Sequence, residues 1–281
     1  MTAAGLKIKA AERRLDIVNM VYGAKAGHIG GSLSSVDIIC ALYYRALDLA
    51  PGVPLNDQPG RDRFILSKGH SVEGYYAVLA DIGFFPKEAL ASYQAFGSPF
   101  IGHPNRKVPG VEFSTGSLGH GLSLGAGVAL AAKRGGAAYR AYVLMGDGEQ
   151  AEGSVYEAAI AASHYGLDNL TAIIDRNGLQ ISGETEKVMS VEPLRARWQS
   201  FGFHVIETDG HDMEQLINAF EEARRVKGTP SLIIARTVKG KGVSFMENKK
   251  EWHHGSMNAE QYEQALSELN RRLDSLLGGE L

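Results

Sequence analysis

The amino-acid sequence predicts an α/β protein built on a doubly wound, mostly parallel β-sheet with helices on both faces. Short apolar runs, each long enough for a strand buried on both faces, recur along the chain and end in turn residues. Segments with apolar residues at helical spacing stand between these runs. No low-complexity linker or internal repeat interrupts the alternation, so we expect a single domain over residues 1–281. The expected strands are 63–67, 141–145, 170–174, 204–207 and 231–237.

Helical spacing predicts the connecting elements in turn. Residues 6–26 form an amphipathic pattern that we expect on the outside of the sheet. Ser34 or Ser35 is expected to cap the next helix, which runs to about Leu47. A small-residue helix should follow the glycine-rich residues 116–127 and continue through residue 130. Further helices are expected at 72–82, 154–165, 213–226 and 258–276, and loops at 50–62 and 84–113.

Composition limits the partners and the compartment. The chain is 44% hydrophobic and 22% charged, with a formal net charge of −3. This small charge gives no basis for nucleic acid or an anionic membrane as a partner. No apolar run is long enough to span a bilayer, and the amino terminus is charged where a signal peptide would be apolar, so we expect a cytoplasmic protein. The lone Cys40 excludes an internal disulfide, and its apolar helical setting favours a packed core residue.

Two polar turns follow neighbouring strands in the centre of the chain. Gly146-Asp147-Gly148 ends the strand at 141–145, and Asn177 lies just past the strand at 170–174. One helix joins the two strands, so they should be parallel neighbours with both turns at one edge of the sheet. A carboxylate, an amide oxygen and a main-chain carbonyl suit magnesium. Either turn alone would be ordinary, but the pair predicts a magnesium-diphosphate site, with the helix after Gly148 directing its positive end at the diphosphate.

Other patterns near this stretch have simpler interpretations. Gly119 and Gly121 suggest a dinucleotide fingerprint, but the spacing and the missing preceding strand reject it. The glycines would instead let the backbone of Gly116 and Leu118 approach a flat heteroaromatic ring. Glu149 and Glu152 fall in the first turns after Gly148, where acidic residues suit the helix dipole, so we expect a capping role.

Several histidines stand in loops. His28 lies between glycines, His70 follows the strand at 63–67, and His103 lies in the irregular stretch at 84–113. Taken singly, His28 is expected to be a surface histidine and His70 one that is bonded to the loop backbone, whereas the aromatic residues around His103 favour a functional stretch. His253 and His254 are adjacent and cannot share one face of a regular element, so a paired metal site is not expected.

These motifs together resemble those of transketolase, a thiamine-diphosphate enzyme. GDG followed about thirty residues later by an asparagine resembles the thiamine-diphosphate motif. The remaining resemblance, in order and spacing, lies in Ala26–Gly31, Leu66–His70, Gly102–Pro104 and Ser114–Gly119. The likeness covers nearly the whole chain and implies the diphosphate-binding (PP-type) fold.

The resemblance also implies roles for individual residues. Magnesium would be held by Asp147, Asn177 and the carbonyl of Leu179. His28, His70, His103 and either His253 or His254 would surround the sugar, His70 and the fourth histidine also contacting the diphosphate. The sequence does not choose between His253 and His254. The remaining cofactor contacts would come from Gly116, Ser117, Leu118, Gly146, Gly148 and Glu149, and acids near Glu149 also cross the dimer interface in thiamine enzymes.

A complete transketolase is more than twice this long, so the resemblance implies one subunit of a split enzyme. The pyrimidine-binding and carboxy-terminal domains, with the glutamate that activates the cofactor, would lie on a separate chain, most simply in an α2β2 assembly. The pair would transfer a two-carbon ketol unit from a ketose phosphate to an aldose phosphate, and this chain would be inactive alone. The donor remains open among pentose-pathway sugars, a branched ketose phosphate and a sulfosugar.

Two other functions remain as alternatives. The α subunit of a thiamine-dependent 2-oxoacid dehydrogenase or decarboxylase shares the GDG segment and is also split, but it would not need the three loop histidines. A non-catalytic subunit that binds magnesium nucleotides would predict affinity for ATP or GTP, but the chain contains no P-loop.

Overall fold

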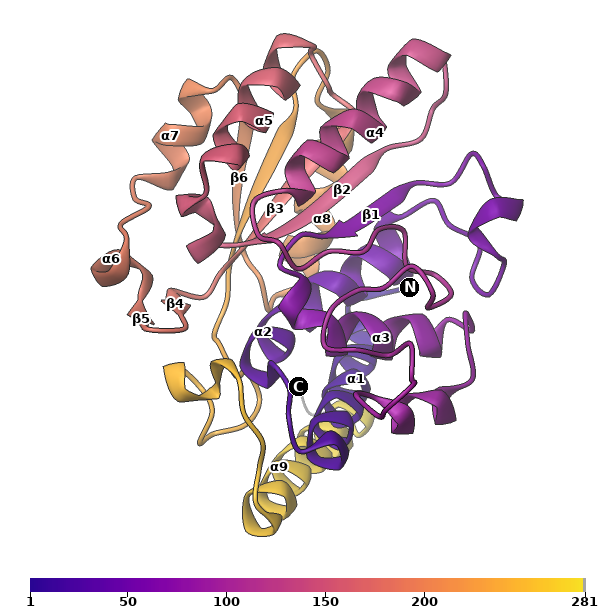
Figure 1. Ribbon diagram of the computed structural model, residues 1–281, viewed down its shortest axis with the longest axis vertical. Coiled ribbons are helices and arrows are strands. Elements are labelled where there is room, and N and C mark those ends of the chain that lie inside the picture. The colour runs from indigo at the N-terminus through magenta and orange to yellow at the C-terminus, as the bar shows by residue number, and fades with distance from the viewer. Residues whose placement is uncertain (280–281) are drawn as a thin grey trace.

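Five parallel strands form the central sheet in the order β1-β2-β3-β7-β6 (Figure 1). The computed structural model describes residues 1–279. Each neighbouring pair in this sheet is parallel, which confirms the predicted arrangement. The strands are β1 (Arg63–Leu66), β2 (Ala141–Gly146), β3 (Leu170–Arg176), β6 (His204–Asp209) and β7 (Ser231–Arg236). A short antiparallel pair, β4 (Leu179–Gln180) and β5 (Gly183–Glu184), follows β3.

Helices fill the connections close to their predicted positions. The α-helices are α1 (Ala3–Ala24), α2 (Ile29–Ala41), α3 (Val72–Asp81), α4 (Gly121–Gly135), α5 (Gly153–His164), α6 (Thr185–Val188), α7 (Leu194–Ser200), α8 (Met213–Arg225) and α9 (Ala259–Leu277). A π-helical turn, Leu42–Ala46, continues α2. The 3-10 helices are Leu55–Asp57, Gly69–Ser71, Lys87–Ser92, Gly148–Ala151 and Lys250–His253.

Alternate residues of each strand enter two separate hydrophobic clusters. In β2, Tyr142 and Leu144 join the cluster built with α1, α2, α3 and α8, whereas Val143 and Met145 join the cluster built with α4, α5 and α7. Figure 1 shows α4, α5 and α7 grouped on one side of the sheet. Because both faces of the central strands are covered, β2 is apolar throughout and β3 and β7 are mostly apolar, whereas the edge strand β6 carries exposed polar residues. This double burial explains why the strand predictions from apolar runs are accurate.

Helix α1 packs differently from the prediction. It lies mainly against α2, α3 and α9, so it belongs to the helical layer rather than directly to the sheet. Helix α9, yellow in Figure 1, runs beside α1, and Tyr22 stacks on Tyr262 with ring centroids 3.8 Å apart. Arg14 of α1 is buried and paired with Asp37 of α2. Since α1 has helices on several sides, its buried polar residues need partners inside the protein.

The predicted caps of the second helix, Ser34 and Ser35, are wrong. Helix α2 already begins at Ile29, so both serines lie inside it. Their hydroxyls instead donate to Asp175 (2.6 Å) and to the carbonyl of Gly31 (2.8 Å). The glycines before them do not form a loop but allow close helix packing: a Cβ at Gly30 would lie 2.5 Å from the carbonyl oxygen of Trp252.

The structure bears on two further expectations, the packing of Cys40 and the lack of a membrane-spanning segment. Cys40 is fully buried in α2 and its thiol is free, which confirms a packed core residue. Burial raises the pKa of the thiol. Among residues 1–279, no helix combines the length and apolar character needed to cross a bilayer.

The packing of α4 on β2 gives a test of the fold. A Cβ added at Gly125 would lie 2.3 Å from the side chain of Val143. Gly125→Ala should therefore destabilise the protein by about 1–3 kcal/mol through overpacking. Gly127, two residues along the same helix, has no neighbour within 4 Å of an added Cβ, so Gly127→Ala should stabilise by up to about 1 kcal/mol through helix propensity. Urea unfolding of both variants measures the difference, and equal stability would refute this packing.

Candidate active site

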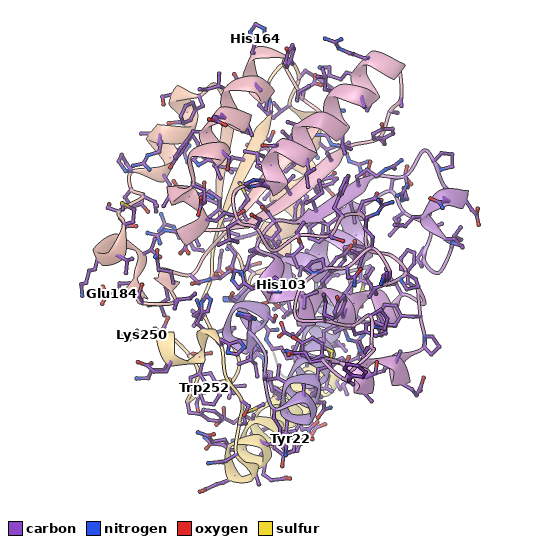
Figure 2. The ribbon with its side chains drawn as sticks, in the orientation of Figure 1. Tyr22, His103, His164, Glu184, Lys250 and Trp252 are labelled. Carbon is purple, nitrogen blue, oxygen red and sulfur yellow. The ribbon has the colours of Figure 1, made fainter. Side chains whose placement is uncertain are left out.

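A cavity of about 420 Å³ opens where β1, β2, β3 and β7 end. The carboxyl ends of parallel strands share one edge of the sheet, so residues far apart in sequence converge there. The cavity is lined by most of the expected residues: His28, His70, His103, Gly116, Leu118, Gly146, Asp147, Gly148, Glu149, Asn177, Leu179 and His253. Ser117 and His254 do not line it. Figure 2 shows His103 near the middle of the molecule, whereas the exposed His164 projects from the far end of α5.

Asp147 joins the ends of β2 and β3. The register places Gly146 opposite Asp175, so the turns after the two strands lie side by side. One carboxylate oxygen of Asp147 accepts from the backbone N–H of Gly148 at 2.7 Å. The other accepts from the N–H of Gly178 at 2.6 Å and from Arg176 at 3.0 Å. Burial, and then the nearby Asp175 carboxylate, raise the pKa of Asp147. A further cation at this oxygen pair would stabilise the ionised form.

The two other expected metal ligands also present oxygen atoms here. The side-chain oxygen of Asn177 accepts from the N–H of Leu179 at 3.1 Å, and the carbonyl of Leu179 accepts from the Lys239 ammonium at 2.8 Å. No cluster of three or more His, Cys, Asp or Glu side chains with metal-binding geometry occurs within residues 1–279. Carboxylate, amide and carbonyl oxygens suit magnesium, which usually completes its octahedron with phosphate oxygens and water. The donor set therefore fits a magnesium-diphosphate site.

Glu149 has a different role from the one its position suggests. The segment after Asp147 is a single 3-10 turn, and α5 begins only at Gly153. Glu149 is buried, and its carboxylate accepts from the N–H groups of Gly146 and Gly119, both at 2.9 Å, and from the Ser67 hydroxyl. It therefore ties β2 to the glycine-rich segment and to the end of β1. The predicted capping role is therefore wrong for Glu149. This residue is not in a first helical turn, because the positive end of α5 lies at Gly153 rather than directly after Gly148.

Four histidines line one wall of the cleft, and a fifth, His254, packs beside them. The ring centroid of His28 lies 5.3 Å from that of His70, 5.9 Å from His103, 5.7 Å from His253 and 4.5 Å from His254. His253 and His254 are adjacent, yet both pack against His28. They can do so because the 3-10 turn ends at His253 and the backbone of His254 is extended. His253 lines the cavity and accepts from Lys239 at its Nδ1 atom, 3.0 Å away. His254 packs on His28 from outside the cavity lining.

Burial keeps the four histidines that line the cavity, His28, His70, His103 and His253, neutral at pH 7. Burial, followed by the neighbouring His254 and His103, lowers the pKa of His28 to about 4. Burial and Lys239 lower the pKa of His253 to about 3. Burial also lowers the pKa values of His70 and His103. A neutral imidazole has one donor and one acceptor nitrogen, so this wall can give and take hydrogen bonds with hydroxyl groups.

Two lysines of the site were not among the expected residues. Lys68 follows β1, is buried, and pairs with Asp175 while its ammonium also contacts the carbonyl of Gly31 at 3.2 Å. Lys239 follows β7, and burial, followed by the charge of Lys68, lowers its pKa to about 8. Both lie just past strand ends, which is the signal that identifies Asp147 and Asn177. A lysine at such a turn is usually a solvated surface residue, so the residue type alone does not indicate a role in the site.

Comparison with known protein families identifies one that matches most of the chain. The family described as transketolase, thiamine diphosphate binding domain, matches residues 7–272. An apulose-4-phosphate transketolase subunit of Phocaeicola vulgatus is 50% identical over 276 residues, which cover 98% of this chain and 98% of that protein. A 6-deoxy-6-sulfo-D-fructose transketolase subunit of Clostridium sp. is 41% identical over 246 residues, covering 87% of this chain and 89% of that protein.

Longer proteins share the same region. Transketolase of Homo sapiens is 37% identical over 271 residues, which cover 96% of this chain and 43% of that protein. The crystal structure of transketolase from Campylobacter jejuni superposes with a TM-score of 0.90 at 32% identity, covering 96% of this chain and 43% of that one. The chain therefore spans less than half the length of these two transketolases.

The buried Glu149 contacts predict a stability difference between two neighbouring acids. Glu149→Gln places an amide where the carboxylate accepts three hydrogen bonds, so it should lower the free energy of unfolding by about 1–3 kcal/mol. Glu152→Gln changes the same charge at an exposed position and should have little effect. Urea denaturation compares the two. Equal stability of both variants would show that Glu149 is not needed to tie these segments together.

The depressed histidine pKa values predict a loss of stability in acid. The pKa of His28 is about 4 in the folded chain and 6.5 when unperturbed. Between these values the unfolded chain binds more protons, so the stabilisation present above pH 6.5 is lost as the pH falls through 4. His28→Gln should make the slope of stability against pH shallower by up to about one proton. His164→Gln is the matched control at an exposed site, and an unchanged slope in His28→Gln would contradict a neutral His28.

Proposed function

Because this chain belongs to the transketolase family as a thiamine diphosphate-binding domain, we propose that it is the amino-terminal subunit of a split transketolase. With a second subunit it transfers a two-carbon ketol unit from a ketose phosphate to an aldose acceptor. The proposal rests on the presence of two groups of residues in one cavity. The first is the set of oxygen atoms of Asp147, Asn177 and Leu179, which we call the oxygen set, and the second is the histidine wall around His28.

The oxygen set would hold the metal and the diphosphate end of the cofactor. Asp147, Asn177 and the Leu179 carbonyl supply oxygen ligands for Mg²⁺, and these atoms already attract the cations Arg176 and Lys239. The backbone N–H of Gly148 lies in the same turn as Asp147. The Lys239 ammonium adds positive charge that would attract phosphate oxygens. Thiamine diphosphate, when bound, supplies the carbon nucleophile that accepts the two-carbon unit.

The histidine wall would bind and orient the sugar. His28, His70 and His103 line the cavity as neutral imidazoles, so each offers an N–H to one hydroxyl oxygen and a nitrogen lone pair to another hydroxyl. A base held near its substrate hydroxyl can hold or return a proton at that nitrogen during transfer. His253 is the fourth such group, since it lines the cavity and contacts Lys239, whereas His254 supports His28 from behind.

A partner chain would complete this site. Ile181 lines the cavity and is 72% exposed. Leu124 on α4, Ile160 on α5 and Met189 after α6 are further large apolar side chains, exposed on segments that follow cavity-lining residues in the chain. Exposed apolar surface is typical of interaction sites. A pyrimidine-binding partner in an α2β2 assembly would cover them and contribute the glutamate that activates the cofactor. A cytoplasmic location agrees with this role.

The names of the relatives direct the choice of donor sugar. Two apulose-4-phosphate transketolase subunits share 50% and 44% of residues with this chain, and one named for a sulfofructose shares 41%. The first donor to test is therefore a branched ketose phosphate such as apulose 4-phosphate, followed by a sulfosugar and xylulose 5-phosphate. The alternative α subunit of a 2-oxoacid dehydrogenase would instead consume pyruvate or a related acid.

Calorimetry of thiamine diphosphate and magnesium tests the proposed cofactor site. The cofactor should bind tightly to this chain mixed with a purified partner and weakly or not at all to the chain alone. Asp147→Ala should weaken binding in the mixture at least tenfold, because it removes the carboxylate ligand. Asp57→Ala removes the same charge from an exposed 3-10 turn, and this variant should bind the cofactor normally.

Donor assays on the same mixture separate the functions. Ketol transfer from a ketose phosphate, with no turnover of 2-oxoacids, is the expected result. Turnover of 2-oxoacids would instead establish the dehydrogenase-type alternative. If a partner associates but thiamine diphosphate does not bind and no ketose reacts, the thiamine proposal is wrong. Full activity of this chain without a partner would reject the proposal of a split enzyme.

A further inference from the structure

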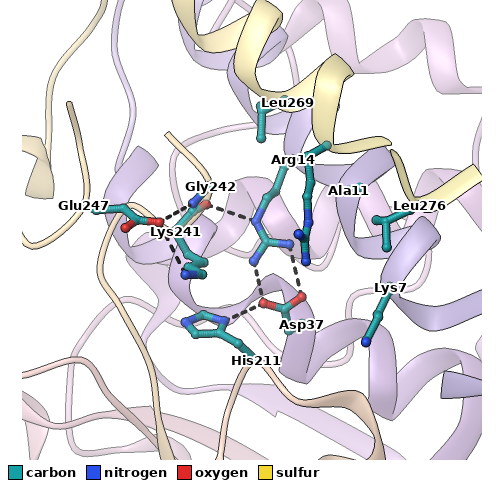
Figure 3. A pocket seen from close by; sticks show the side chains of 11 residues that line it. Lys7, Ala11, Arg14, Asp37, His211, Lys241, Gly242, Glu247, Leu269 and Leu276 are labelled. Carbon is teal, nitrogen blue, oxygen red and sulfur yellow. Dashed lines mark hydrogen bonds and ion pairs between the residues drawn. The ribbon is translucent and has the colours of Figure 1, made fainter. Parts of the chain in front are cut away.

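A second cavity, of about 290 Å³, lies between α1, α9 and the loops that follow β6 and β7 (Figure 3). It shares no lining residue with the candidate active site. Side chains of Lys7 and Arg14 enter it from α1, and Arg272 enters it from α9. Ala11, Leu269 and Leu276 supply an apolar part of the wall.

A closed hydrogen-bond network forms the floor of this cavity. Asp37 accepts from Arg14 and from Nδ1 of His211, the latter at 2.6 Å. Nε2 of His211 accepts from the backbone N–H of Val238 at 2.8 Å, which assigns the neutral tautomer to this histidine. Burial alone would raise the pKa of Asp37, but Arg14 and His211 lower it to about 2. Arg14, Asp37 and His211 therefore satisfy one another and leave no charge for a ligand.

The remaining charges of the cavity are unbalanced. Lys241 pairs with Glu247 at 3.5 Å. Lys7 and Arg272 form no ion pair within 4.0 Å among the described residues, so the residues that line the cavity carry a net charge of about +2. Outside the lining, Asp212 has its pKa lowered by hydrogen bonds from backbone N–H groups and, in part, by the charge of Lys7. Two unpaired cations held beside an apolar wall favour a doubly charged anion over a monoanion. The volume is at the lower end of the range for small-molecule sites, so the anion would be small.

We propose that this cavity is a second anion-binding site that takes a small phosphorylated metabolite. Lys7 and Arg272 contact the phosphate, and Leu269 and Leu276 cover its short carbon chain. The site stands independently of the proposed transketolase activity, because its residues are separate from the catalytic cleft.

The loop over the floor connects this cavity to the cleft. Val238 donates to His211, and the carbonyl of Lys241 accepts from Arg14 at 3.0 Å. Between them stands Lys239, whose ammonium reaches Leu179 and His253 in the cleft. Lys241 and Gly242 of this loop line the cavity together with Lys7 and Arg272. An anion bound there would contact the loop and stiffen it, and through it the position of Lys239, which makes the site suited to regulation.

Binding of inorganic phosphate at pH 7.5 tests the proposal. Calorimetry should show saturable binding to the full chain, weakened at least fivefold in Arg272→Gln and lost in the Lys7→Gln, Arg272→Gln double variant. Arg271→Gln removes the same charge one residue away on α9, outside the cavity, and should bind as the natural chain does. Hydrogen exchange should slow at residues 238–242 when phosphate binds, and this slowing should be absent in the double variant.

Three outcomes would overturn the proposal. The natural chain could fail to bind phosphate. Phosphate could bind equally well to the double variant, which would place it in the catalytic cleft or elsewhere. Arg271→Gln could weaken binding as much as Arg272→Gln, which would show a diffuse charge effect. Thermal unfolding of all variants confirms that the substitutions leave the fold intact.

Discussion

The ion pair between Lys68 and Asp175, buried beneath the cleft, is the contact on which the site depends. Asp175 is fully buried at the end of β3 and accepts hydrogen bonds from Lys68, Ser34, Thr237 and Asn177. Burial alone would raise the pKa of Asp175, but Lys68 and the hydroxyl donors lower it. A buried charge is tolerated only when it is paired and fully hydrogen-bonded. The single carboxylate therefore fixes the ends of β1, β3 and β7 and the start of α2 relative to one another.

Above this ion pair, the cleft separates two kinds of chemistry. Oxygen atoms of Asp147 and Leu179 lie with cations on one side, and neutral imidazoles around His28 lie on the other. The cations Lys68 and Lys239 serve both sides. Lys68 pairs with the Asp175 carboxylate and Lys239 contacts the Leu179 carbonyl, and both add to burial in lowering the pKa values of His70 and His253. This arrangement suits a ligand with an anionic end and a polyhydroxy end, because each end meets groups of the right charge.

The loop at 238–242 shows how the doubly wound fold links the two sides of the protein. It leaves β7 at the cleft, presents Lys239 to the site, and then turns over the floor formed by Arg14 and His211. Its backbone is bonded to α1 through Arg14, and the N–H of Gly240 donates to Gly30 of α2. The position of the lysine is therefore set by the helical layer as well as by the strand that carries it.

The strands, most helices and the pairing of Asp147 with Asn177 follow from the sequence alone, because burial on both faces leaves apolar runs and strand ends leave polar turns. Which groups meet was decided only in the tertiary structure. Lys68 is an ordinary turn lysine in sequence and a buried counter-ion in the fold. Glu149 has the sequence position of a helix cap and is instead a junction between three segments. The five histidines gather only because strands and loops from distant parts of the chain end at one edge of the sheet. Local patterns encode secondary structure, whereas charge pairing and convergence depend on contacts between segments that are far apart along the chain.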